Sequence, residues 1–129
     1  DGIQENIALV DRPANSCAIV HSDSPEGIQR LNQEAAKVMA NARRAGMQIA
    51  PERAIMWLTY NAARSLGVEQ QTGSLEVGKM GDVVVWNGSP FSSYAQAEKV
   101  YIDGHQVYDR VDVRRQPLSD FMLGQEARP

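Results

Sequence analysis

The sequence has little of several features that define whole classes of protein. It holds one cysteine, Cys17, and two histidines among its 129 residues. A single cysteine excludes an internal disulfide framework, and no apolar run approaches the ~18–20 residues of a membrane-spanning helix. The net charge is only −3, and no stripe of Lys and Arg is present, which argues against nucleic-acid binding. We therefore expect neither a membrane nor a nucleic acid as a partner.

What is present is the composition of a soluble globular protein, with 43% apolar and 22% charged residues. A chain of this length can bury roughly two-thirds of its unfolded surface, which is enough for one core. Frequent aliphatic residues and the low net charge argue against disorder. We expect a soluble protein, either cytoplasmic or exported if a signal peptide precedes Asp1.

The beginning of the chain has two interpretations. It starts Asp1-Gly2, without Met, and Ile3, Ile7 and Val10 already have helical spacing. A removed tag or a processed N-terminus is one explanation. The other is that the chain is cut from a longer protein.

The next stretch predicts a strand followed by a long helix. Residues 16–21 form a short apolar run between turn residues, which is typical of a strand buried on both faces. Ser24, Pro25 and Glu26 then supply a hydroxyl cap, a first-turn proline and an acid near the positive helix end. The helix is expected to end at Gly46, with one apolar stripe formed by Ile28, Leu31, Ala35, Val38, Met39, Ala42 and Ala45.

A second helix is predicted from Pro51 to Leu66, with Gly67 as its stop and Asn61 as a candidate break into two short helices. Its expected apolar face consists of Ile55, Leu58, Ala62 and Leu66.

Glycines then punctuate a set of strands, expected at 82–86, 99–102 and 106–108. Asp103-Gly104 is a hairpin signal between two of them, in a loop of two residues or more. The chain thus predicts one α/β unit followed by an antiparallel piece. A strand buried on both faces requires neighbours, and no second parallel strand precedes residue 82, so the sheet lacks most of its members.

Four stretches carry recognisable motifs. They read IVHSDSPEGIQR (19–30), WLTYNAARSLG (57–67), TGSLEVGKMGDVVVW (72–86) and EKVYIDGHQVY (98–108). In this order they resemble four parts of the metal-dependent amidohydrolases: the end of the eighth barrel strand with its loop, the helix pair after it, the segment that follows the barrel, and the closing hairpin. The likeness extends over most of residues 3–125, with the imidazolonepropionase-like branch as the nearest part of the family.

The resemblance implies a fold and a function. The chain would be α/β, with the last β/α unit of a TIM barrel in residues 1–71, the C-terminal strands of a small composite β-sandwich in 72–112, and a surface tail in 113–129. It would be the C-terminal part of an enzyme that hydrolyses amide (C–N) bonds of a cyclic or linear substrate with a metal-activated water. The alternative is a non-catalytic, truncated module that serves in folding or subunit association. The upstream barrel is the implied partner, and we expect a homo-oligomer.

Asp23 is the principal candidate site residue. It follows the predicted strand directly, at the edge where a barrel carries its active site. The resemblance implies a carboxylate that contacts the metal or its water and moves a proton to the leaving group. A residue at such a junction can also be a turn or capping residue. His21 lies two residues earlier, on the same side of the strand, and is a candidate for substrate contact or support of Asp23.

The remaining polar candidates have weaker claims. His105 lies in a turn, and Cys17 sits early in the predicted strand, where a cysteine behaves as a small apolar residue. The implied metal, expected to be zinc, needs several imidazoles, and this chain has only two histidines. Most ligands are therefore expected outside this segment, and the segment alone is expected to be inactive.

Overall fold

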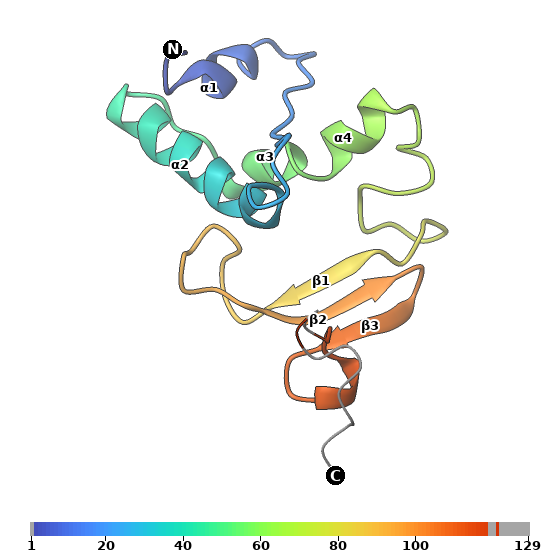
Figure 1. The fold of residues 1–129 in the computed structure, drawn as a ribbon. Helices are drawn as coiled ribbons and strands as arrows, with labels where there is room; N and C mark the ends of the chain where they lie inside the picture. The colour runs from blue at the N-terminus through green and yellow to red at the C-terminus, as the bar shows by residue number, and fades with distance from the viewer. Residues whose placement is uncertain (1, 119–120, 122–129) are drawn as a thin grey trace.

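A computed structural model describes residues 2–118 and 121. It places short helices in one layer and a three-stranded sheet below them, joined by a long connection after α4 (Figure 1). In chain order the described elements are α1 (Asn6–Val10), the 3-10 turn η1 (Ile28–Arg30), α2 (Leu31–Arg44), α3 (Pro51–Met56), α4 (Tyr60–Ser65), β1 (Val83–Trp86), β2 (Ala97–Ile102), β3 (His105–Asp109) and the 3-10 turn η2 (Val113–Arg115).

The first long helix forms as predicted, but it begins later. Residues 25–27 make a turn, and the Ser24 hydroxyl accepts the Gly27 backbone N–H at 3.1 Å. Regular α-helix starts at Leu31 and ends at Arg44, two residues before Gly46. Ala35 and Ala42 of the predicted stripe are fully buried, whereas Ile28, in η1, is 56% exposed. The stripe prediction is therefore correct within α2 and wrong at both ends, since Ala45, the C-cap of α2, is also exposed.

The second predicted helix is two helices, as the candidate break allowed. The break lies at residues 57–59, just before Asn61, and Thr59 has φ −130° and ψ −93°, outside the helical region. The interruption rotates the second half relative to the first. Asn61 and Ala63 are buried as a result, and Leu66 is 76% exposed, so the single apolar face expected over 51–66 is wrong.

Residues 16–21 do not form the predicted strand. They contain no helix, turn or bend, and no strand pairs with them among the described residues. A ladder needs a neighbouring backbone, and β1, β2 and β3 pair only with one another. The Val20 N–H instead donates to the Trp57 carbonyl at 3.2 Å. We call residues 16–21 the extended segment.

The sheet has the antiparallel order β1-β2-β3, with Val84 opposite Val100 and Val100 opposite Tyr108. The predicted hairpin is confirmed, with a loop of two residues. Asp103 and Gly104 have φ +50° and +78°, and Ile102 pairs with His105 across the turn. Two consecutive positive φ values match the twist that a tight hairpin requires.

The core lies among the helices and the extended segment. Trp57 is fully buried at its centre, with Ala18, Val20, Ala35 and Ala54 around it. The β1–β2 connection reaches this core: Phe91 packs against it, and the Asn32 carboxamide donates to the Pro90 carbonyl at 2.7 Å. This connection fastens the sheet to the helical layer.

The sheet itself leaves apolar side chains on both faces. Val84 and Val85 are adjacent in β1 and therefore point to opposite faces, and they are 44% and 40% exposed. In the tail, Val113, Leu118 and Phe121 are exposed, and residues 119–120 and 122–129 of the predicted surface tail lie outside the described residues. None of the helices in the described part of the chain has the length and apolar character to cross a bilayer.

Candidate functional site

His21 and Asp23 lie together at the end of the extended segment. The His21 Nδ1 is 3.6 Å from the Asp23 Oδ1, and the two side chains are 76% and 99% exposed. The predicted juxtaposition is therefore present, although no strand forms and Asp23 lies in a bend. An imidazole and a carboxylate thus face solvent side by side.

The loop that carries Asp23 is closed by two serines. The Ser22 hydroxyl accepts the Ser24 N–H at 3.1 Å and donates to the Ser24 carbonyl at 3.3 Å. The Ser24 hydroxyl donates to Glu26 at 2.8 Å, and this hydrogen bond lowers the pKa of Glu26. Capping of the loop is therefore done by Ser24. The hydrogen bonds of the described residues include none to the Asp23 carboxylate, whose near neighbour is His21.

The extended segment is held by the helices α3 and α4. The Asn61 carboxamide donates to the Ala18 carbonyl at 2.8 Å, and the Cys17 thiol donates to the Asn61 carbonyl at 3.3 Å. Asn61 is only 1% exposed. From the sequence, Asn61 was predicted only as a candidate helix break and as part of the 57–67 motif. No local pattern indicated its buried role.

A second polar group precedes the extended segment. Arg53 donates from Nε and Nη2 to the two carboxylate oxygens of Asp11, at 2.7 and 2.6 Å, and the Ser16 hydroxyl donates to Asp11 at 3.1 Å. Burial raises the pKa of Asp11, but the hydrogen bonds from Arg53 and Ser16, the nearby Trp57 indole and the charge of Arg53 outweigh it. The pKa of Asp11 therefore lies below its usual value. No sequence pattern links residues 11 and 53, so this pair was missed.

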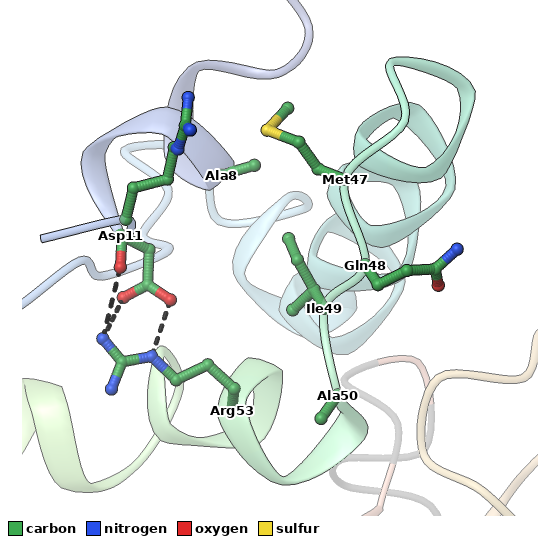
Figure 2. Close-up of a pocket in the computed structure, with 8 residues that line it drawn as sticks. Ala8, Asp11, Met47, Gln48, Ile49, Ala50 and Arg53 are labelled. Carbon is green, nitrogen blue, oxygen red and sulfur yellow. Dashed lines mark hydrogen bonds and ion pairs between the residues drawn. The ribbon is translucent and has the colours of Figure 1, made fainter. Parts of the chain in front are cut away.

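Figure 2 shows that this ion pair lies at one side of a pocket of about 450 Å³. The facing wall comes from the segment between α2 and α3, with Met47, Ile49 and Ala50 as its apolar part. Asp11 comes before the extended segment and Asp23 after it. Neither His21 nor Asp23 is among the residues that line the pocket. The pocket and the His21–Asp23 pair are therefore separate sites.

The described residues supply only part of a metal site. They include no group of three or more His, Cys, Asp and Glu side chains placed to hold an ion. His105, the other histidine, is exposed at the start of β3 rather than within the turn. The imidazole of His21 and the carboxylate of Asp23 have the donor types that zinc accepts, but zinc needs at least one further ligand.

The comparisons with known proteins agree with this partial character. The family model described as "Amidohydrolase family" matches residues 11–109. An imidazolonepropionase of Pseudomonas syringae pv. tomato is 43% identical over 51 residues, which are 40% of this chain and 13% of that protein. An imidazolonepropionase of Shewanella oneidensis is 50% identical over 40 residues, which are 31% of this chain and 10% of that protein.

A solved structure also matches. The amidohydrolase of Thermotoga maritima MSB8 superimposes with a TM-score of 0.71 at 33% identity, over 83% of this chain and 26% of that protein. The chain thus spans about a quarter of the length of that protein. The family model covers Asp23, the extended segment and all three strands. The chain belongs to the amidohydrolase family.

Proposed function

We propose that this chain is the C-terminal part of a metal-dependent amidohydrolase that hydrolyses an amide (C–N) bond of a cyclic or linear substrate. The observation that carries the proposal is the exposed Asp23 carboxylate beside His21, at the end of the extended segment and inside the family match. In α/β barrels the ends of the strands carry the catalytic groups.

The unpaired backbone supports the same proposal. Residues 16–21 have no strand neighbour among the described residues, as expected for a barrel strand whose partners belong to upstream sequence. The exposed apolar residues on both faces of the sheet fit a sheet that is covered by other parts of the protein. We therefore assign residues 1–71 to the barrel, 72–112 to the composite β-sandwich and 113–129 to a surface tail.

The donor set of this chain fits a share of a zinc site. Asp23 would supply one oxygen ligand, and His21 lies close enough to it to supply a nitrogen or to contact substrate. When bound, a divalent metal supplies Lewis acidity and lowers the pKa of water. The remaining ligands would come from the rest of the protein.

The chemistry assigned to this chain is proton movement at Asp23. A carboxylate oxygen of Asp23 accepts a proton from the attacking water and delivers it to the leaving amide nitrogen, which is general base and then general acid catalysis. Ser22 and Ser24 make the hydrogen bonds that close the loop. The Asp23 carboxylate is therefore not needed as a capping group and is available for proton transfer. The neighbouring imidazole, 3.6 Å away, can orient the carboxylate or contact the substrate.

Asp23→Asn in the complete natural protein tests the proposal. The assay is hydrolysis of a panel of amides that includes imidazolone propionate, with zinc-replete protein and the melting temperature measured alongside. We expect turnover to fall by ~10²–10⁴-fold. Stability should stay within about 0.5 kcal/mol, because the side chain is almost fully exposed.

His21→Asn is the matched control, since it changes the neighbouring side chain at the same end of the segment. If His21 only supports Asp23, its replacement reduces turnover far less than that of Asp23. An Asp23→Asn variant within tenfold of the unaltered protein would make Asp23 a turn residue and remove the main support for hydrolysis.

A further inference from the structure

The described hydrogen bonds that hold the extended segment come from two neighbouring parts of the chain. Its start is bonded through Ser16 to Asp11 and Arg53, its middle through Cys17 and Ala18 to Asn61, and Val20 through its N–H to the Trp57 carbonyl. These contacts come from the segment just before it and from the α3–α4 pair. The helices therefore fix the position of the segment along its own axis.

Asn61 is the central contact of this series. Its side chain is buried, and one residue engages two consecutive positions: the carboxamide bonds the Ala18 carbonyl, and the backbone carbonyl accepts the Cys17 thiol. Ala18 is itself only 4% exposed. Loss of the carboxamide would leave the Ala18 carbonyl buried without this partner, which is an unfavourable state for a polar group.

We propose that Asn61 is a positioning residue for Asp23. The inference rests on the proposed role of Asp23. Asn61 fixes the extended segment at Ala18, and from there the backbone runs to the serine-closed loop that presents Asp23. Loss of this hydrogen bond would let the backbone shift at Ala18, and the shift would pass along the chain to His21 and Asp23. The buried Asn61 carboxamide opposes that shift.

The test compares Asn61→Leu with Asn32→Leu in the complete natural protein. Both substitutions keep the approximate size and remove a carboxamide that donates to a backbone carbonyl, at 2.8 Å for Asn61 and 2.7 Å for Asn32. The Asn61 carboxamide donates to the extended segment, whereas the Asn32 carboxamide donates to the β1–β2 connection. Asn32→Leu is therefore a control for the general cost of losing such a bond.

Three readouts are measured: kcat and KM for whichever amide of the panel is turned over, the zinc content per chain, and the melting temperature. We expect Asn61→Leu to lower kcat by roughly 10- to 100-fold, as misplacement of a reacting group by about 1 Å does. KM should change little, and the zinc content should fall. Asn32→Leu should lower the melting temperature with kcat and zinc content unchanged.

Asn61→Ser is the second variant, since its hydroxyl is too short to reach the Ala18 carbonyl and it disturbs the core less. The inference would be overturned if kcat falls by the same factor in the Asn61 and Asn32 variants. It would also be overturned if the kcat of Asn61→Leu stays within twofold of that of the unaltered protein. The inference would also be overturned if neither Asn61 variant folds while Asn32→Leu does, because Asn61 would then serve stability and not the position of Asp23. If Asp23→Asn abolishes turnover and Asn61→Leu does not, only the positioning role fails. If Asp23→Asn is active, the proposed function fails first.

Discussion

Gly73 and Gly78 provide a matched pair of substitutions, since they have almost the same backbone conformation in different surroundings. Their φ angles are +88° and +92°. A Cβ added at Gly78 would meet nothing within 4 Å. A Cβ added at Gly73 would lie 2.6 Å from the Ala63 Cβ, 3.2 Å from the Tyr60 Cα and 3.3 Å from the Thr59 carbonyl oxygen. Gly73 thus allows the connection after α4 to pass directly over that helix.

Both Gly→Ala changes place an L-residue in the left-handed region, which costs about 1–2 kcal/mol. Only Gly73→Ala adds overpacking, worth about 1–3 kcal/mol, and two of the three atoms in its way belong to the backbone and cannot rotate aside. We expect a loss of about 1–2 kcal/mol for Gly78→Ala and about 2–5 kcal/mol for Gly73→Ala.

The assay is urea unfolding of each variant, followed by tryptophan fluorescence and far-UV circular dichroism. Trp57 reports directly, because it is fully buried beside the helix pair that Gly73 overlies. Equal losses for the two variants, within about 0.5 kcal/mol, would refute the close packing of the connection against α4. A larger loss for Gly78→Ala would reverse the argument altogether.

Further predictions concern charge, metal and surface. Arg53→Met leaves the Asp11 carboxylate, which is 6% exposed, without its cation, and should lower the free energy of unfolding by about 2–4 kcal/mol. Lys37→Met removes one partner of an exposed ion pair and should lower it by less than about 0.5 kcal/mol. Similar losses for the two variants in urea unfolding would contradict this prediction. Folding lowers the pKa of Asp11, so the ionised carboxylate stabilises the fold above its unfolded pKa of about 3.9. This stabilisation is lost as the pH falls through the folded pKa. The free energy of unfolding, measured from neutral to acid pH, should therefore depend less on pH in Asp11→Asn than in the unaltered protein. The 129-residue chain should bind zinc weakly, since His21 and Asp23 supply two donors at most. Stoichiometric binding with submicromolar affinity in titration calorimetry would contradict this prediction. The same chain should self-associate through the apolar residues on both faces of its sheet, and a clean monomer at high micromolar concentration in light scattering would count against it.

Local patterns were sufficient for much of the fold. The apolar spacing over 31–44 predicted α2, and the glycines at 46 and 67 correctly marked where helices end. Asp103-Gly104 predicted the hairpin because a two-residue turn needs residues that tolerate positive φ. The motifs over 19–108 identified the amidohydrolase family, which the family match confirms. These features depend on residues close together in the chain, so the sequence alone determined them.

The tertiary structure decided what depends on distant partners. Residues 16–21 have the composition of a buried strand, but a ladder requires a neighbouring backbone, and the segment is held by Trp57 and Asn61 instead. Asp11 and Arg53 are 42 positions apart, and no local pattern pairs them. Whether a polar side chain is a helix break, a surface group or a buried support is set by what packs against it. For Asn61, that is a carbonyl 43 residues away in the chain.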